Sequence, residues 1–373
     1  MAGLRVGVVF GGRSGEHEVS LMSAASIMRT LVSAGYDVVP IGIDKGGRWL
    51  LPASTDAALQ GILESGSQPV SMLPQPGQQG LVRLEPGRGT LGLAARIDVV
   101  FPALHGTYGE DGAIQGLLEM ADIPYVGAGV LASAVGMDKE VQKRLFRQAG
   151  IPVLDFKMVQ RTRFGREPDV VIDEIERQFG YPCFIKPCNL GSSVGVTKAK
   201  DRPGLKAALE DASLYDRRLL VEQAAQDARE IECSVLGNDD PIASMPGEIL
   251  PAREFYDYMA KYHDSRSRTE VPARLPKDTI EEVRDLATRC FRVIDCCGMA
   301  RVDFFVSRND YSVVVNEINT IPGFTKISMY PKMWEASGIS YPELLTRLVD
   351  LALERHAEKN RRVTEYRPPS DVI

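Results

Sequence analysis

Four polar side chains in the segment 299–325 could form a site for a metal ion and a phosphate group. Arg301 and Asp303 lie in the run ARVDFFV, and Glu317 and Asn319 lie in the run YSVVVNEIN. Two carboxylates and an amide oxygen, with no His or Cys in either run, form the hard oxygen-ligand set that suits Mg²⁺ bound together with substrate phosphates. Arg301 would then face the phosphate charge. The alternative is the solvated outer face of an edge hairpin.

Both runs are predicted to be β-strands, because β-branched and aromatic residues dominate them, and residues 307–310 between them predict a hairpin turn. Side chains alternate along a strand with a period of two. Arg301 and Asp303 therefore share one face of the first strand, and Glu317 and Asn319 share one face of the second. All four converge if odd-numbered residues pair with odd-numbered residues, a register that the sequence alone leaves open.

A second candidate site is the Gly/Ser-rich turn in CFIKPCNLGSSVGVTKA, residues 183–199. The turn joins two predicted strands and the chain contains no GK[ST], so it is not a Walker A loop. Backbone N–H groups and hydroxyls at such a hairpin tip can cradle phosphate, and Lys186 just before it can pair with phosphate as a point charge. The alternative is a flexible turn without a chemical role.

The loop HGTYGEDG, residues 105–112, is a third candidate, because its glycines let the backbone approach a ligand closely beside His105. A surface histidine and a helix-capping Asp111 form the structural alternative. Residues 127–132, GAGVLA, match the dinucleotide pattern GxGxxA, but no suitable acid follows about 20 residues later. A tight turn before a helix is the preferred interpretation. Four dispersed histidines without an HExxH motif argue against zinc.

The elements that must position these residues alternate between strands and helices. A strand at 4–10, a glycine loop and a helix at 18–34 predict an opening α/β unit. The Pro/Gly/Gln-rich region 65–89 is predicted to be an exposed excursion. Further strands are predicted at 36–44, 97–104, 153–159, 183–187, 195–199, 219–223 and 230–237, and further helices at 138–150, 278–295 and 341–356.

The composition, with 44% hydrophobic and 25% charged residues in 373, is that of an ordinary globular protein of two or three domains. A net charge of −6 argues against nucleic acid as a partner. No apolar run approaches the roughly 20 residues that span a bilayer, and no signal-peptide pattern opens the chain. We therefore expect no membrane association and a cytoplasmic location. The six cysteines lack CxxC spacing and are expected to be buried thiols.

Seven motifs follow one another along the chain: GGRSGEHEVSL, HGTYGEDG, MDK, FIKPCNLGSSVGV, YDYMAKY, ARVDFF and NEINTIPGFT. Together they resemble the ATP-grasp superfamily and, within it, the D-alanine:D-alanine ligase family, over about residues 4–345. The resemblance implies a three-domain ATP-grasp fold of α/β and α+β class. An N-terminal parallel α/β substrate-binding domain (1–136) would precede two α+β domains that hold ATP between them. The central one (137–226) would carry a glycine-rich lid loop, and the C-terminal one (227–373) a magnesium site.

The resemblance also implies which residues bind ATP and metal. Lys139 and Lys186 would contact the phosphates. Arg301 would stabilise the transferring charge. The other implied nucleotide contacts are Glu222 at the adenine, Glu230 at the ribose, and Ser193, Lys261 and Asn316. The implied ligands of two Mg²⁺ ions, for which Mn²⁺ can substitute, are Asp303, Glu317 and Asn319.

For the amino-acid substrates, the resemblance implies that Glu16 binds the ammonium group of the first D-alanine and is linked to Ser192 and Tyr262. His105 would lie near the same substrate. Ser328 and the backbone near Met329 would bind the carboxylate of the second D-alanine.

The implied activity joins two D-alanine molecules through an acyl phosphate, for peptidoglycan precursor synthesis, in a homodimeric enzyme. An acyl phosphate must be shielded from water, and NLGSSVG and the loop 254–270 are the candidate lids. Two alternatives are a D-alanine:D-lactate ligase and a nucleotide-binding regulator without turnover. Tyr262 argues against the first, because the family associates Phe at this position with D-lactate. The intact set of Arg301, Asp303, Glu317 and Asn319 argues against the second.

Overall fold

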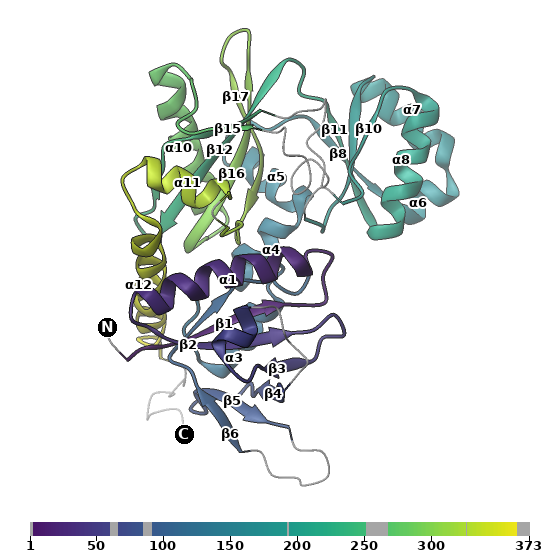
Figure 1. The fold of residues 1–373 in the computed structure, drawn as a ribbon. Coiled ribbons are helices and arrows are strands. Elements are labelled where there is room, and N and C mark those ends of the chain that lie inside the picture. Colours follow the sequence, from purple (N-terminus) through teal and green to yellow (C-terminus); the bar gives the residue numbers. More distant parts are fainter. Residues whose placement is uncertain are drawn as a thin grey trace, which may run out of the picture.

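The computed structural model describes residues 3–59, 66–84, 92–191, 194–250, 268–325 and 327–363. Three β-sheets, which follow one another along the chain, form its framework (Figure 1). No helix within these ranges is long and apolar enough to cross a membrane. All six cysteines lie in the described residues as free thiols, and five of them are buried.

The first sheet has seven strands in the order β6-β5-β4-β3-β2-β1-β7. β1 pairs in parallel with β2 and β7, which confirms the expected parallel unit, whereas the pairings from β2 outward to β6 are antiparallel. The strands are β1 (Arg5–Gly11), β2 (Asp37–Ile43), β3 (Trp49–Leu51), β4 (Gln68–Met72), β5 (Gly80–Arg83), β6 (Leu93–Arg96) and β7 (Val99–Pro102).

The prediction of an exposed excursion at 65–89 was wrong for the residues that form β4 and β5. These two strands pair with each other and extend the sheet, and Val70, Met72 and Leu81 are buried. The period-two spacing of Val70 and Met72 is a strand pattern that the abundance of Pro, Gly and Gln conceals in the sequence.

Helices α1 to α3 pack with the first sheet, whereas α4, which follows them in the chain, packs with the third. α1 begins directly after the glycine loop, and its buried residues, from Val19 through Ser23 and Ile27 to Leu31, recur at helical spacing and face β1. The chain turns away at Gly35, whose φ of +87° suits glycine. The helices are α1 (His17–Ser33), α2 (Thr55–Leu59), α3 (Ala113–Ala121) and α4 (Val130–Met137).

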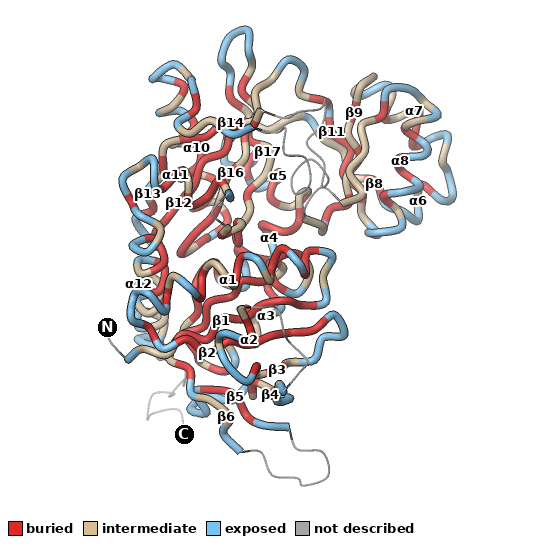
Figure 2. Tube along the Cα trace, in the orientation of Figure 1, coloured by how far each residue is buried: buried red, intermediate tan, exposed pale blue. Residues whose placement is uncertain are grey.

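The second sheet is small and antiparallel, with the strand order β10-β9-β11-β8. Two helices, α7 and α8, pack on it around a separate hydrophobic core, and their outer faces are exposed (Figure 2). The elements are β8 (Phe156–Gln160), α6 (Arg161–Arg166), α7 (Pro168–Phe179), β9 (Cys183–Pro187), β10 (Thr197–Ala199), α8 (Arg202–Tyr215) and β11 (Arg218–Gln223).

The third sheet is also antiparallel and has the order β15-β14-β12-β16-β17, with β13 paired to β12. α10 covers it, and α4 and α5 contribute Ala132 and Phe146 to the same core. The elements are α5 (Lys139–Gln148), β12 (Ala228–Gly237), β13 (Ile242–Ala243), β14 (Gly247–Leu250), β15 (Arg268–Glu270), α10 (Lys277–Val293), β16 (Gly298–Ser307) and β17 (Val313–Asn319).

Two C-terminal helices, α11 (Met329–Ala336) and α12 (Tyr341–Lys359), join the first sheet to the third. Leu344 and Leu348 of α12 share one core with Val6 and Phe10 of β1 and with Met299 of β16. Figure 1 shows α12 running from the third sheet down to the first. The long separations in sequence within this core explain why the order of elements alone does not reveal it.

Candidate functional site

The four polar side chains of the β16–β17 hairpin do converge. Arg301 pairs with Asn319, and Asp303 pairs with Glu317, so odd-numbered residues lie opposite odd-numbered residues. Directly opposite residues on one face have Cβ atoms only about 5 Å apart. The register that the sequence left open is therefore the one that gathers the two carboxylates, the amide and the guanidinium.

A β-bulge follows this cluster. The register shifts between Asp303 and Phe304, so that Phe304 pairs with Val315 and no residue of β16 lies opposite Asn316. A bulge re-aims side chains. Asn316 and Glu317, although adjacent in sequence, consequently both line the same cavity, and Asn316 accepts a hydrogen bond from Lys186 Nζ at 3.3 Å.

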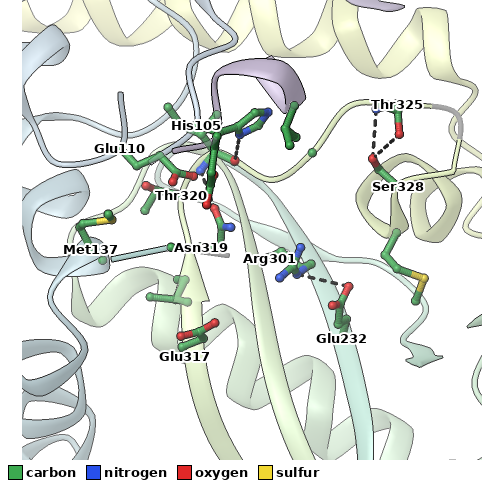
Figure 3. Close-up of a pocket in the computed structure, with 18 of the residues that line it drawn as sticks. His105, Glu110, Met137, Glu232, Arg301, Glu317, Asn319, Thr320, Thr325 and Ser328 are labelled. Carbon is green, nitrogen blue, oxygen red and sulfur yellow. Dashed lines mark hydrogen bonds and ion pairs between the residues drawn. The ribbon is translucent and has the colours of Figure 1, made fainter. Parts of the chain in front are cut away.

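Two cavities meet at the hairpin. The first lies between α1, the 105–112 loop, the hairpin and the start of α11 (Figure 3). The second lies between the second and third sheets. Lys139, Glu232 and Glu317 line both of them. A molecule in one cavity can therefore reach a molecule in the other at this shared wall.

Arg301 lines the first cavity beside the shared wall and contacts Glu232 of that wall. Its guanidinium makes a bidentate contact with the Asp303 carboxylate, at 2.6 and 2.7 Å, and lies 3.2 Å from Glu232. Burial alone would lower the pKa of Arg301, but Asp303 and Glu232 raise it well above its ordinary value. Arg301 is thus a permanent cation in a site that would otherwise be strongly acidic.

The second cavity contains a buried carboxylate between two lysines. Glu222 of β11 lies 2.7 Å from Lys143 of α5 and 2.5 Å from Lys186 of β9. Burial raises the pKa of Glu222, but the two lysines outweigh it and lower the pKa overall. Burial lowers the pKa of Lys143, whereas Glu222 and Glu317 overcome the same effect at Lys186 and raise its pKa. Glu230 of β12 lines the same cavity.

Lys139 lies at the N-terminus of α5, which Asp138 caps by accepting a hydrogen bond from Val141 N–H. Its ammonium donates to the Leu190 carbonyl at 2.6 Å and lies 3.4 Å from Glu317. Leu190 belongs to the Gly/Ser-rich turn. Lys139 therefore connects this turn to the hairpin across the shared wall.

His105 is buried at the end of the first cavity. Its hydrogen bonds anchor the segment 321–324, which leads to Ser328. The imidazole Nδ1 lies 3.1 Å from the Ile321 carbonyl oxygen. Because a carbonyl oxygen can only accept a hydrogen bond, Nδ1 must be the donor. Its Nε2, at 2.9 Å, then accepts from Ser23 Oγ, which in turn accepts from Phe324 N–H. Burial lowers the pKa of His105, although Glu16 opposes the shift. The imidazole is therefore neutral, and the alternative of a surface histidine was wrong.

Two carboxyl groups face the first cavity near His105. Glu16 precedes α1, and Glu110 lies in the 105–112 loop; both are buried. Burial, and then the nearby Glu16, raise the pKa of Glu110 well above its ordinary value.

Ser328 lies at the opposite side of this cavity, immediately before α11 (Figure 3). Its hydroxyl accepts from Thr325 N–H at 3.1 Å and lies 2.8 Å from Thr325 Oγ1. A Cβ at Gly323 would be 2.9 Å from the Ser328 Oγ, so any larger residue at this position would displace the hydroxyl. Met329 also lines the cavity.

Four predicted site residues lie outside the described residues. They are Ser192, Ser193, Lys261 and Tyr262, and most of the candidate lid 254–270 lies outside as well. Among the described residues, the structure brings every other predicted site residue to one of the two cavities.

Sequence reasoning assigned no role to three charged residues of this site. Glu232 lies two residues after Glu230 on β12 and opposite Asp303, a period-two signal that was present in the sequence. Lys143 lies four residues after Lys139 and thus on the same helix face. Apart from its place in the HGTYGEDG loop, no feature of the sequence indicates a functional role for Glu110.

The described residues contain no group of three or more His, Cys, Asp and Glu side chains that could hold a metal ion. Asp303 and Glu317 supply two carboxylates, and Asn319 supplies an amide oxygen. This donor set fits a hard cation such as Mg²⁺ when phosphate oxygens complete its coordination, because Mg²⁺ is usually held by one or two carboxylates plus substrate.

Comparison with known proteins decides the family. The family model "D-ala D-ala ligase N-terminus" matches residues 5–128, and "D-ala D-ala ligase C-terminus" matches residues 145–350. The chain belongs to the D-alanine–D-alanine ligase family. The enzyme is accordingly an ATP-dependent ligase with the ATP-grasp fold, which confirms the family, fold class and enzyme class expected from the motifs.

Relatives resemble the enzyme over nearly its whole length. The D-alanine–D-alanine ligases of Caldicellulosiruptor bescii and Heliobacterium modesticaldum are 50% and 51% identical to it. The alignments cover 96% and 97% of this chain and 98% of each relative. Among solved structures, the D-alanine–D-alanine ligase of Coxiella burnetii is 40% identical, with a TM-score of 0.82 and 97% of both chains covered. The VanG D-Ala:D-Ser ligase of Enterococcus faecalis is 34% identical, with a TM-score of 0.83. This alignment covers 94% of the present chain and 99% of the VanG chain.

Proposed function

We propose that the enzyme uses ATP to join two D-alanine molecules into D-alanyl-D-alanine for peptidoglycan precursor synthesis. The observation that carries the proposal is the shared wall of the two cavities at Lys139, Glu232 and Glu317, with Arg301 beside it in the first cavity. One cavity suits a small amino acid, and the other suits a nucleotide whose phosphates reach that wall. The names of the relatives at about 50% identity support the choice of D-alanine.

In the proposed reaction the carboxylate of the first D-alanine attacks the γ-phosphate of ATP and releases ADP. The amine of the second D-alanine then attacks the resulting acyl phosphate, and phosphate leaves. Phosphoryl transfer depends mainly on positioning and charge neutralisation. Lys139, Lys186 and Arg301 supply positive charge along the path from the second cavity to the first. No nucleophilic side chain is needed.

Asp303, Glu317 and Asn319 would hold two Mg²⁺ ions, for which Mn²⁺ can substitute. When bound, these ions neutralise charge on the ATP phosphates. In the proposal, Glu222, Glu230 and Asn316 bind the nucleotide, together with Ser193 and Lys261.

Glu16 binds the ammonium of the first D-alanine, aided by Ser192 and Tyr262. The neutral His105 lies beside this substrate and fixes the backbone at Ile321. Ser328 and the backbone at Met329, where α11 begins, bind the carboxylate of the second D-alanine. A carboxylate at this helix N-terminus also benefits from the free backbone N–H groups.

The choice of second substrate is the point on which the nearest alternatives differ. The VanG neighbour is named for D-serine, at 34% identity. D-lactate is the other candidate. Tyr262 argues against it, because the family associates Phe at this position with the use of D-lactate. A regulator without turnover would have no need of the ion pairs that hold Arg301 and Lys139 in place.

The test is phosphate release from ATP and Mg²⁺ with D-alanine alone and with D-alanine plus D-serine or D-lactate, each product identified by mass. We expect phosphate with D-alanine alone and D-alanyl-D-alanine as the product. Nucleotide binding without phosphate release for every pair would contradict a ligase. If D-alanine is joined to D-serine or D-lactate in preference to a second D-alanine, the proposed second substrate is wrong.

We also infer from the family resemblance a cytoplasmic homodimer. Sedimentation of the purified chain at micromolar concentration tests the oligomer, with a monomer of 40.9 kDa as the contrary result. Cell fractionation tests the location.

A further inference from the structure

Glu110 has no part in the proposed reaction, although its carboxyl group lines the first cavity. Figure 3 shows it on the cavity wall near His105. The residue is 6% exposed, and its Oε2 accepts a hydrogen bond from Gly106 N–H at 2.7 Å. Its Oε1 is buried and has no hydrogen-bond partner among the described residues. A buried polar atom without a partner is costly, so this oxygen calls for a donor from outside.

Glu16 brings a second carboxyl group to the same place. A Cβ at Gly106, the residue that bonds to Glu110, would lie 3.6 Å from the Glu16 Cδ. A Cβ at Gly191 would lie 2.7 Å from Glu16 Oε1 and 3.8 Å from Glu110 Oε2. The two carboxyl groups, from the start of α1 and from the 105–112 loop, thus approach one another beside the Gly/Ser-rich turn.

The cations of the described residues nearby are engaged elsewhere. Lys139 contacts the Leu190 carbonyl and Glu317. Arg301 is held by Asp303 and Glu232. Neither forms an ion pair with Glu110 in the part of the chain that the structure describes. Burial and then Glu16 raise the pKa of Glu110, against the opposing effects of Gly106 N–H, Lys139 and Arg301. The negative charge on this carboxyl group is therefore unfavourable until a nearby positive charge compensates it.

We propose that Glu110 is a second carboxyl group that binds the ammonium of the first D-alanine, together with Glu16. An ammonium group has three N–H donors and can bond to both carboxyl groups at once. It would supply both the missing donor at Oε1 and the missing positive charge. The inference rests on the proposed function, because it takes the amino acid in the first cavity as given. The competing view is that Glu110 only fixes the loop through its bond to Gly106.

Glu110→Gln separates these two views. Glutamine keeps the size of the side chain and an oxygen that can accept from Gly106 N–H, but it carries no charge. Loss of a charged hydrogen bond predicts D-alanine binding weakened roughly 10- to 100-fold, measured by calorimetry with ADP and Mg²⁺ present. The KM for ATP and the melting temperature should stay close to those of the wild type. The matched control is Glu335→Gln, the same chemical change at an exposed position of α11. It should bind D-alanine as the wild type does.

Glu110→Asp provides the second comparison. Aspartate keeps the charge but is too short to keep the bond to Gly106 in its present geometry. An ammonium-binding role predicts that Asp retains more D-alanine affinity than Gln, whereas a loop-fixing role predicts the reverse order. Wild-type affinity in Glu110→Gln, or failure of both variants to fold, would overturn the inference. Absence of D-alanine binding and phosphate release in the wild type would contradict the proposed function instead.

Discussion

At the residue level, each charged group at or beside the shared wall already has a partner within the protein. Arg301 holds Asp303, and Lys139 lies beside Glu317. Substrate phosphates and a metal ion would therefore exchange existing ion pairs for new ones instead of meeting bare charges. Such preorganised charge lowers the cost of reorganisation during phosphoryl transfer. The same pairs keep a cluster of acidic groups tolerable before substrate binds.

Glu317→Gln should remove most of the activity, because it deletes one of only two carboxylates in the donor set and the partner of Lys139. By comparison with the loss of other charge-neutralising groups, we expect phosphate release to fall roughly 10³-fold or more. The measurement is the initial rate at saturating ATP, D-alanine and Mg²⁺. Glu335→Gln, at an exposed position of α11, is the control and should be as active as the wild type. A rate in Glu317→Gln close to that of the control would remove the proposed metal role.

The buried His105 predicts a pH dependence of stability. Its pKa is lowered in the folded protein, chiefly by burial. As the pH falls below the ordinary value of about 6.5, the unfolded chain takes up a proton that the folded protein resists, so the free energy of unfolding decreases. Between pH 7.5 and 5.5 the wild type should lose roughly 1 kcal/mol more than His105→Gln, which does not titrate. Urea unfolding of both proteins at the two pH values measures the difference; equal losses would show that His105 is protonated alike in both states.

The residue types of the site could be predicted more fully than their partners. Asp303, Glu317 and Asn319 stand out because polar residues are unexpected in strongly β-forming runs. Glu232 and Lys143 do not stand out, because their importance comes from contacts to residues 69 and 79 positions away in the chain. Such contacts depend on tertiary packing, which a local pattern does not contain.

At the level of elements, the sequence predicted the strands of the hairpin but not how they pair. β-Branched residues indicate strands, whereas the register and the bulge after Asp303 arise from the whole third sheet. A strict period of two would put Asn316 on the face opposite Glu317; the bulge brings both to one cavity. The missed strands β4 and β5 show the same limit, since short antiparallel strands with Pro and Gly gain their burial from neighbours in the sheet.

The start of β16 depends on close contact with the turn before α4. Gly298 has a φ of +72°, and a Cβ there would lie 3.0 Å from backbone atoms of Gly127. Gly298→Ala should therefore suffer both backbone strain and a clash, at a total cost of about 2–4 kcal/mol in the free energy of unfolding. Gly338→Ala is the matched control, because its φ is +87° but nothing lies within 4 Å of its Cβ. Urea unfolding should show the larger loss for Gly298→Ala; equal losses would mean that the backbone at Gly127 yields easily.

At the level of the whole molecule, the cores do not all follow the expected domain boundaries. The three sheets fall within 1–136, 137–226 and 227–373, and the second sheet has its own core. The first sheet, however, shares a core with α11 and α12, and α5 packs with the third sheet. We therefore propose that the first and third parts unfold together and that residues 156–223 form the more independent unit. An independent second sheet would let one wall of the second cavity move while the first cavity stays intact.

Two leucines of equal burial test this proposal. Leu348 lies in the core that joins α12 to the first sheet, Leu209 lies in the core of the second sheet, and both are fully buried. Either change to Ala should cost about 2–5 kcal/mol, because it leaves a cavity. Hydrogen exchange should then accelerate in β1, β16 and α12 for Leu348→Ala, but only within residues 156–223 for Leu209→Ala. If exchange in Leu348→Ala accelerates in α12 alone, the shared core does not couple the two parts. If Leu209→Ala also opens β1, the second sheet is not an independent unit, and the second cavity cannot change shape without the rest of the enzyme.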